Sequence, residues 1–190
     1  MAQSADTGTR VLGPDDIGRA LTRIGFEIVE AQKGRDDMLI IGIQRRGVPL
    51  ARRIGEAIRR TGGTHRALND LVGALDITMF RDDLDRHPTR VPQETVIPAG
   101  GIDGRTVVLV DDVLFSGRTV RAALDALSAI GRPAAVRLAV LVDRGHRELP
   151  IRPDFVGKNL PTSRREAVRV LLTETDGRDG VLLDREEPSA

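Results

Sequence analysis

A pair of carboxylates and a turn of small polar residues lie next to each other in VVLVDDVLFSGRTVRAAL, residues 107–124. Asp111 and Asp112 directly follow four apolar residues that predict a buried strand, and the turn at 116–119 precedes an apolar period typical of a helix. Backbone N–H groups at a helix N-terminus, together with the hydroxyls of Ser116 and Thr119, can hold a phosphate. The carboxylates can accept hydrogen bonds from a sugar diol or face a divalent cation. The segment therefore predicts a site for a phosphorylated ribose with a metal nearby.

An ordinary acidic turn between a strand and a helix is the alternative interpretation, and a lone Asp-Asp pair would favour it. Here the strand, carboxylates, turn and helix follow in the order in which such folds bind ligands. A Walker A loop is excluded, because the only Gly-Lys pair, Gly157-Lys158, is followed by Asn159, and there is no G-x-G-x-x-G motif.

This segment resembles the phosphoribosyl-pyrophosphate (PRPP) signature of the type I phosphoribosyltransferases. The resemblance implies that Asp111 and Asp112 hold the ribose hydroxyls and act in catalysis, and that residues 116–119, here called the phosphate turn, hold the 5′-phosphate. It implies that PRPP or UMP is also lined by the residues that follow the carboxylates: Val113, Leu114, Phe115, Ser116, Gly117, Arg118 and Thr119.

A second polar turn, Gln44-Arg45-Arg46-Gly47, follows a predicted strand at 38–43 and precedes a predicted helix at 48–60. We call it the arginine turn. The residues alone are equally compatible with two solvated arginines in a loop. The resemblance implies that this turn binds the pyrophosphate leaving group, with Arg46 in a catalytic role.

A long segment without a clear pattern separates a predicted strand at 71–79 from the signature and contains Pro88, Pro92 and Pro98. Such a segment inside one compact domain is typically a lid or a disordered loop, and a floppy insertion is the alternative. The resemblance implies a flexible hood that closes over the substrates, with Arg81 and Asp82 at the PRPP site. We call residues 80–98 the hood segment.

The composition describes one globular domain spanning residues 1–190, with 40% hydrophobic and 30% charged residues. The absence of cysteine excludes disulfides and thiolate metal sites. No apolar run is long enough for a membrane span and no signal peptide is recognisable, so we expect a cytoplasmic protein. A net charge of +1 means that contact with a polyanion would need a local patch. No His, Asp and Glu residues have the spacing of a permanent metal site, so Mg²⁺ is expected to arrive with PRPP.

Alternating strand and helix patterns predict a twisted parallel α/β sheet flanked by helices, with right-handed crossovers. The turns at 44–47, 111–119 and 143–147 should then lie at one edge of the sheet, where such sheets bind ligands. Residues 1–12 and 185–190 are expected to be loose tails. The remaining expected elements are a helix from 14 to 34, strands at 107–110, 136–142, 155–156, 169–173 and 181–184, and a hairpin turn at 176–180.

Four further stretches resemble a narrower family, the pyrimidine-operon regulators that double as uracil phosphoribosyltransferases. They are ALTRIGFEIVE at 20–30, ALDITMFRDDL at 74–84, LAVLVDRGHRELPIR at 138–152 and GKNLPTS at 157–163. The resemblance implies that uracil and PRPP give UMP and pyrophosphate with Mg²⁺, and that the strand end at Val142, Asp143 and Arg144 lies beside uracil. The alternatives are a phosphoribosyltransferase without specific RNA binding, or one that acts on another base.

The same resemblance implies binding to the leader of pyrimidine-operon mRNA, with UMP or UTP as the regulatory ligand. The family's RNA-contacting positions fall on Thr22, Arg147 and Arg152, with Lys158 nearby. Residues 143–169 carry a net charge of +3, which alone would favour a solvated arginine face. Because one small domain offers little area for RNA, we expect a homo-oligomer.

Two residues depart from the pattern of this family. Phe26 stands where relatives that bind RNA well have a histidine, and Phe115 stands where tyrosine is common. A phenylalanine at 26 cannot donate a hydrogen bond to RNA. The sequence leaves His146 open, either as a donor to nucleotide or RNA or as a cap for backbone groups in its loop.

Overall fold

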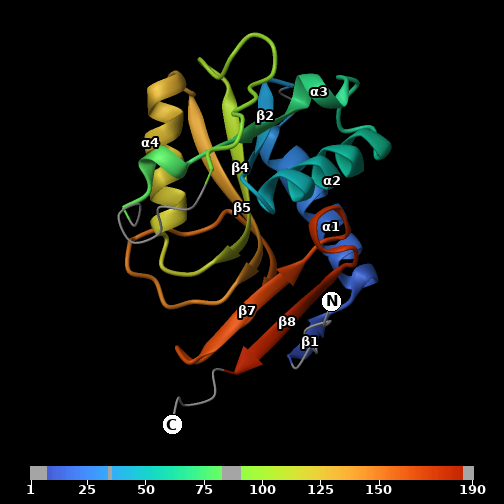
Figure 1. The fold of residues 1–190 in the computed structure, drawn as a ribbon. Coiled ribbons are helices and arrows are strands. Elements are labelled where there is room, and N and C mark those ends of the chain that lie inside the picture. The colour runs from blue at the N-terminus through green and yellow to red at the C-terminus, as the bar shows by residue number, and fades with distance from the viewer. Residues whose placement is uncertain (1–7, 34–35, 83–90, 186–190) are drawn as a thin grey trace.

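A five-stranded parallel sheet forms the centre of the computed structural model, which describes residues 8–33, 36–82 and 91–185. Its strands are β2 (Met38–Ile43), β3 (Val72–Leu75), β4 (Thr106–Leu114), β5 (Ala135–Asp143) and β6 (Phe155–Asn159), in the spatial order β3-β2-β4-β5-β6 (Figure 1). All four pairings are parallel, so the carboxyl ends of the strands share one edge.

Helices cover both faces of this sheet. Helices α1 (Pro14–Gln32) and α2 (Gly47–Arg60) pack on one face against Ile40, Val108 and Val110, and α4 (Arg118–Ile130) packs on the other against Ile41 and Leu109. Successive strand residues point to opposite faces, and a sheet covered on both sides needs continuous apolar strands. The runs MLIIGI and VVLV satisfy this requirement, and the predicted fold class is confirmed.

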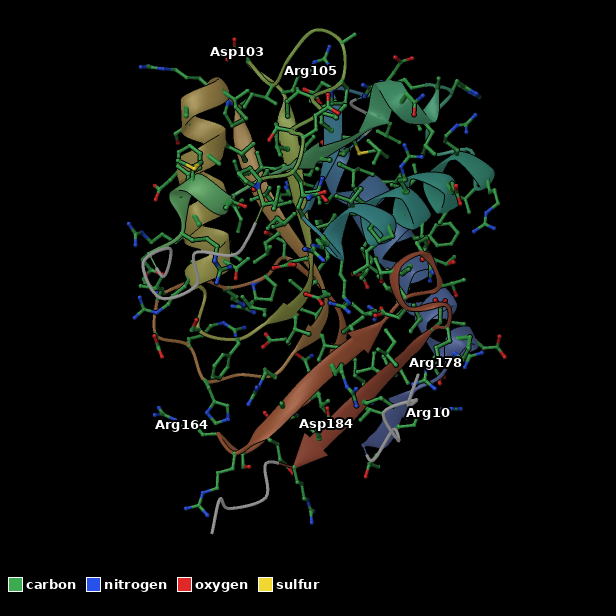
Figure 2. The ribbon with its side chains drawn as sticks, viewed as in Figure 1. Arg10, Asp103, Arg105, Arg164, Arg178 and Asp184 are labelled. Atoms are coloured by element: carbon green, nitrogen blue, oxygen red, sulfur yellow. The ribbon has the colours of Figure 1, made fainter. Side chains whose placement is uncertain are left out.

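A second, antiparallel sheet joins the two ends of the chain. It consists of β1 (Thr9–Leu12), β8 (Gly180–Arg185) and β7 (Glu166–Leu171), in that order. It lies beyond the carboxyl ends of the parallel strands, as Arg10 and Asp184 show, whereas Asp103 and Arg105 lie at the opposite end of the protein (Figure 2). The short helix α5 (Thr173–Asp176) lies in the connection between β7 and β8.

The structure corrects several of the predicted elements. Strand β4 continues to Leu114, beyond the predicted 107–110, and β7 covers residues 166–171 instead of 169–173. Residues 9–12 are strand β1 instead of part of a loose tail, and Arg185 is the last residue of β8. The predicted strand at 71–79 is only β3; the short helix α3 (Leu68–Leu71) precedes it, and a 3₁₀ turn (Thr78–Phe80) follows. The remaining residues of the predicted tails, 1–7 and 186–190, lie outside the described part of the chain, as does residue 34 at the expected end of the first helix.

Local chemistry explains where α1 begins. Pro14 occupies the first turn, where its missing N–H is not needed. The Asp16 carboxylate accepts a hydrogen bond from the N–H of Gly13 at 2.9 Å. Within the described residues, no helix is long and apolar enough to cross a membrane.

Candidate functional site

The phosphate turn and the arginine turn lie at the same edge of the sheet and border two adjoining cavities. The larger, about 670 Å³, is lined mainly by residues 113–120 together with Asp82 and Glu148. The smaller, about 520 Å³, is lined by segments 44–46 and 76–78 and by Val91, Gln93 and Asp112. Both cavities share four lining residues, which are Arg81, Asp111, Val113 and Thr119. The structure thus brings together the residues predicted for PRPP and UMP.

The phosphate turn leads into helix α4, and the N–H of Arg118 makes only a long hydrogen bond of 3.4 Å to Ser116 Oγ. The first helical bond runs from the N–H of Arg121 to the carbonyl of Gly117 at 3.0 Å, so the N–H groups before Arg121 have no acceptor inside the helix. Gly117 has φ of 93°, and a Cβ there would lie 3.2 Å from Ile151. The backbone conformation therefore favours glycine, and the Ile151 side chain leaves little room for a Cβ. This turn can place several donors around one anion.

The two carboxylates belong to strand β4 itself, and three residues, 113–115, separate them from the phosphate turn. Asp111 is 8% exposed, and its Oδ1 accepts the N–H of Asp112 at 3.0 Å, while Asp112 Oδ1 accepts the N–H of Val113 at 2.8 Å. Burial raises the pKa of Asp111 well above its ordinary value, and the neighbouring charge of Asp112 raises it further. Burial also raises the pKa of Asp112, partly offset by the N–H of Val113 and by Arg46. A cation or hydroxyl donors would relieve this crowding of negative charge.

The arginine turn packs directly against β4. A Cβ on Gly47 would collide with the carbonyl oxygen of Val110, so only glycine lets the turn approach the residue before Asp111. The Gln44–Arg45 peptide bond is cis. Arg45 is exposed, whereas Arg46 is half-buried and its Nη2 donates to Asp176 Oδ1 at 2.9 Å.

The start of the hood segment also reaches the site. Arg81 lines both cavities. Asp82 Oδ2 accepts a hydrogen bond from Arg118 Nη1 at 2.6 Å, and Arg118 Nε donates to Glu148 at 2.8 Å. These bonds tie the hood segment to the phosphate turn. Residues 83–90, including Pro88, lie outside the described part of the chain.

The residues predicted on the uracil side are not brought into the cavities. Val142 is buried in β5. Asp143 accepts hydrogen bonds from Gly145 and Arg147 inside its own loop, at 3.0 and 2.5 Å. Arg144 is buried, and its guanidinium lies against the ring of Phe115, which does line the larger cavity. Any effect of Arg144 on a bound base must therefore pass through Phe115.

Comparison with known proteins agrees with this geometry. Residues 14–170 match the family model of the phosphoribosyl transferase domain. The bifunctional protein PyrR of Leifsonia xyli subsp. xyli is 64% identical over 175 residues, covering 92% of this chain and 95% of that protein. The bifunctional protein PyrR of Streptomyces coelicolor is 65% identical over 173 residues, covering 91% and 88%. The chain belongs to the PyrR family. The family predicted from the sequence is thereby confirmed.

Solved structures share the fold of this PyrR-family chain. The hypoxanthine phosphoribosyltransferase of Trypanosoma cruzi superimposes with a TM-score of 0.67 at 16% identity, covering 94% of this chain and 97% of that one. A hypoxanthine-guanine phosphoribosyltransferase from Bacillus anthracis gives a TM-score of 0.61 at 14% identity, covering 80% and 84%. At this level of identity the likeness shows the fold alone.

Two of the four predicted RNA-contacting residues lie on neighbouring elements of this PyrR-family fold. Helix α1 packs along β6, and Arg23 donates to the carbonyls of Val156 and Gly157 at 2.9 and 2.8 Å. These bonds cover the open edge of the sheet. Thr22 lies on α1 and Lys158 on β6, beside this contact. Phe26, one turn along from Thr22, is 54% exposed.

The other two predicted RNA-contacting residues have different surroundings. Arg152 is exposed. The Arg147 guanidinium points inward and donates to the carbonyls of Ile151, Phe115 and Gly145 at 3.0, 3.0 and 3.2 Å, in addition to its ion pair with Asp143. Arg147 thus holds its loop against the start of the phosphate turn. His146 has a ring nitrogen 2.5 Å from the carbonyl oxygen of Thr162, which favours its interpretation as a cap for a backbone group.

Sequence reasoning missed several residues that line the cavities. Asp76, Ile77 and Thr78 form a polar turn at the carboxyl end of β3, but the sequence analysis placed them inside a strand. Asp76 accepts the N–H of Thr78 at 2.6 Å and that of Gln93. The polar side chains of this turn could have indicated that the strand ends earlier, because a strand covered on both faces should be apolar and should end before Asp76.

Among the described residues, no group of three or more His, Cys, Asp or Glu could hold a metal ion.

Proposed function

We propose that this chain converts uracil and PRPP to UMP and pyrophosphate, and that with UMP or UTP bound it binds the leader of pyrimidine-operon mRNA and lowers expression of the operon. The observation that carries the enzymatic part is the position of the buried carboxylate pair between the phosphate turn and the arginine turn. PRPP carries a phosphate at one end of its ribose and a pyrophosphate at the other. The two adjoining cavities match this distribution of charge.

The roles of the residues follow from their positions. The N–H groups and hydroxyls of residues 116–119 hold the 5′-phosphate, and the pKa-shifted carboxylates of Asp111 and Asp112 accept the ribose hydroxyls. Arg46 and the N–H groups of residues 45–47 hold the pyrophosphate, whereas the N–H of Gln44 donates to the carbonyl of Leu75 at 3.0 Å. Arg81, which lines both cavities, contacts PRPP from the hood segment.

Mg²⁺ fits this site as a companion of PRPP. Oxygen ligands suit Mg²⁺, which is usually bound by one or two carboxylates plus substrate phosphates, and the crowded pair Asp111 and Asp112 offers such ligands. When bound, the ion neutralises charge on the pyrophosphate. We propose no permanent metal site.

The chemistry needs no nucleophilic side chain. As the bond between C1 of the ribose and the pyrophosphate lengthens, negative charge grows on the leaving group and Arg46 stabilises it. Positive charge grows on the ribose, near the carboxylates of Asp111 and Asp112. Closure of the hood segment would exclude water, which competes with uracil for the electron-deficient carbon.

The base lies on the side of Phe115 in this proposal. The Phe115 ring borders the larger cavity and is backed by Arg144. Val142 and Asp143 affect the base indirectly, because they hold the end of β5 and the loop that follows it. The Phe115 ring offers an apolar surface to a planar base.

The regulatory part of the proposal places RNA along α1, β6 and the loop after β5. Arg152 and Lys158 offer donors there, and Thr22, whose hydroxyl donates to the carbonyl of Gly18 at 2.9 Å, offers its oxygen as an acceptor. Arg164 adds an exposed cation in the connection between β6 and β7, at the end of the molecule with the antiparallel sheet (Figure 2). Arg147 acts by fixing the loop that carries Arg152. We further propose a cytoplasmic homo-oligomer, and sedimentation at micromolar concentration tests the oligomer: a monomer would contradict it.

The direct test is product formation from labelled bases. With PRPP and Mg²⁺, we expect labelled uracil to give UMP and an equal amount of pyrophosphate, whereas labelled hypoxanthine gives no nucleotide. Product from hypoxanthine and none from uracil would overturn the proposed substrate. No product from either base would overturn the proposed activity.

A further inference from the structure

The arginine turn is held by a residue from the far end of the chain. Arg46 Nη2 donates to Asp176 Oδ1 at 2.9 Å, an ion pair whose side chains are 36% and 21% exposed. Arg46 lines the smaller cavity and is close enough to Asp112 to lower its pKa. The Nε of Arg46 is buried and has no hydrogen-bond partner among the described residues. The guanidinium is thus anchored through Nη2 while the Arg46 side chain still lines the smaller cavity.

Asp176 is itself fixed in orientation. Its Oδ2 accepts the N–H of Leu172 at 2.9 Å and the hydroxyl of Thr175 at 2.7 Å, which leaves Oδ1 for Arg46. Partial burial raises the pKa of Asp176, but these hydrogen bonds and Arg46 outweigh it, so that the pKa lies below its ordinary value. The carboxylate is therefore charged at neutral pH and presents one defined oxygen to the arginine turn.

The connection that carries Asp176 is fastened to α2 at a second point. Arg53, two helical turns after Arg46 and hence on the same face of α2, binds Glu174 at 2.9 and 2.6 Å and Asp179 at 2.6 and 2.8 Å. The hydrogen bonds from Arg53 lower the pKa of Asp179 to about 2. Arg46 of the arginine turn and Arg53 of α2 thus hold three carboxylates of one connection. Of the two arginines, only Arg46 also lines a cavity.

We propose that Asp176 is a positioning residue for phosphoribosyl transfer: it holds the Arg46 guanidinium at the place where the pyrophosphate of PRPP binds and leaves. This inference rests on the proposed function. It gives the antiparallel sheet a part in the reaction, because β7 and β8 carry the connection in which Asp176 lies. Uracil and the 5′-phosphate are bound by other groups, so the effect of Asp176 should be confined to pyrophosphate.

The test is steady-state kinetics of Asp176→Asn. We expect the KM of PRPP and the inhibition constant of pyrophosphate to rise about five- to tenfold, the effect of a weakened hydrogen bond to a charged group. The KM of uracil and the affinity for UMP, which has no pyrophosphate, should change less than about twofold. Glu174→Gln is the matched control, since it lies two residues away and contacts Arg53 alone; its constants should equal those of the wild type.

A double-mutant cycle separates positioning from general support of the fold. In an Arg46→Ala background, Asp176→Asn should cause no further rise in the pyrophosphate inhibition constant, because its effect passes through Arg46. If Asp176→Asn does not fold, Thr175→Val, which removes one bond that orients the carboxylate, should raise the same constant about twofold.

Several results would overturn the inference. One is an inhibition constant of pyrophosphate that stays unchanged in the variants that fold. Another is a lower inhibition constant, which would make Asp176 a competitor of pyrophosphate for Arg46. A third is an equal rise in the KM of uracil and in the inhibition constant of pyrophosphate. The two proposals fail separately. A wild type that makes no UMP refutes the proposed function, whereas an active wild type with an indifferent Asp176 refutes only the positioning role.

Discussion

The guanidinium carbon of Arg144 lies 4.3 Å from the centre of the Phe115 ring. Arg144 also donates to Thr162 Oγ1 and to the carbonyls of Ser163 and Glu166, at 3.1, 3.1 and 2.6 Å. One buried cation therefore joins the loop before β7 to the aromatic ring that borders the larger cavity, and a cation–π contact supports that ring. Arg144 thus combines a structural role with an indirect role at the site.

Replacing Arg144 should destabilise the whole domain. Arg144→Ala removes a buried side chain and leaves the partly buried carbonyl groups of Ser163 and Glu166 without this donor, so we expect the free energy of unfolding to fall by about 2–3 kcal/mol. Urea unfolding measures this change. Arg152→Ala, which removes an exposed arginine, is the control and should stay within about 0.5 kcal/mol of the wild type. Equal midpoints for Arg144→Ala and the wild type would contradict the assigned bonds.

Asp112→Asn should abolish catalysis without unfolding the protein. The substitution keeps an oxygen that can accept the N–H of Val113 but removes the charge that faces the ribose and Mg²⁺. We expect kcat/KM for UMP formation to fall by at least about a hundredfold, with a melting temperature no lower than that of the wild type. An unchanged kcat/KM would remove Asp112 from the mechanism.

Asp111 illustrates a conflict between activity and stability. The pKa of Asp111 is raised in the folded state, so the folded protein keeps the Asp111 proton to higher pH than the unfolded chain does. The free energy of unfolding therefore falls as pH rises from the unfolded pKa, about 3.9, through the raised folded pKa. Asp111→Asn cannot ionise and escapes this loss.

We therefore expect Asp111→Asn to raise the melting temperature at pH 7. A rise of about 2–4 °C would correspond to about 1 kcal/mol for a domain of this size. The difference in melting temperature should vanish below about pH 4, where Asp111 of the wild type is as neutral as the asparagine of the variant. Calorimetry at pH 7 and below pH 4 checks it. A lower melting temperature at pH 7 would show that the charged form is favoured in the free protein.

Local signals explain which parts of the site were predictable. The carboxylate pair near the end of β4 and the phosphate turn before α4 lie within one short stretch of sequence, so residue types and spacing predicted that they lie close together. Strand β1 could not be recognised, because TRVL becomes a strand only by pairing with β8 at the other end of the chain. The partnership of Arg46 with Asp176 and the inward turn of Arg147 depend in the same way on contacts between distant segments. Such contacts leave no spacing in the sequence.

The structure separates two ways in which arginines can affect RNA binding. Arg152 is exposed and free to approach a phosphate, so Arg152→Gln should weaken binding and reduce the slope of log affinity against log salt by about one. The Arg147 side chain is 23% exposed and held by its own loop. We expect Arg147→Gln to weaken binding by loosening that loop while the slope stays unchanged. Filter retention at several salt concentrations distinguishes them, and a reduced slope for Arg147→Gln would show that it contacts phosphate directly.

The most direct test of the proposal that one protein both makes UMP and binds RNA in response to it is a filter-retention assay. It measures binding of a pyrimidine-operon leader transcript with and without UMP. We predict nanomolar binding that requires UMP, which would also show that Phe26 is tolerated in place of the family's histidine. Weak binding that ignores UMP and disappears at moderate salt would be non-specific electrostatics. That result would contradict the regulatory role and leave a phosphoribosyltransferase alone.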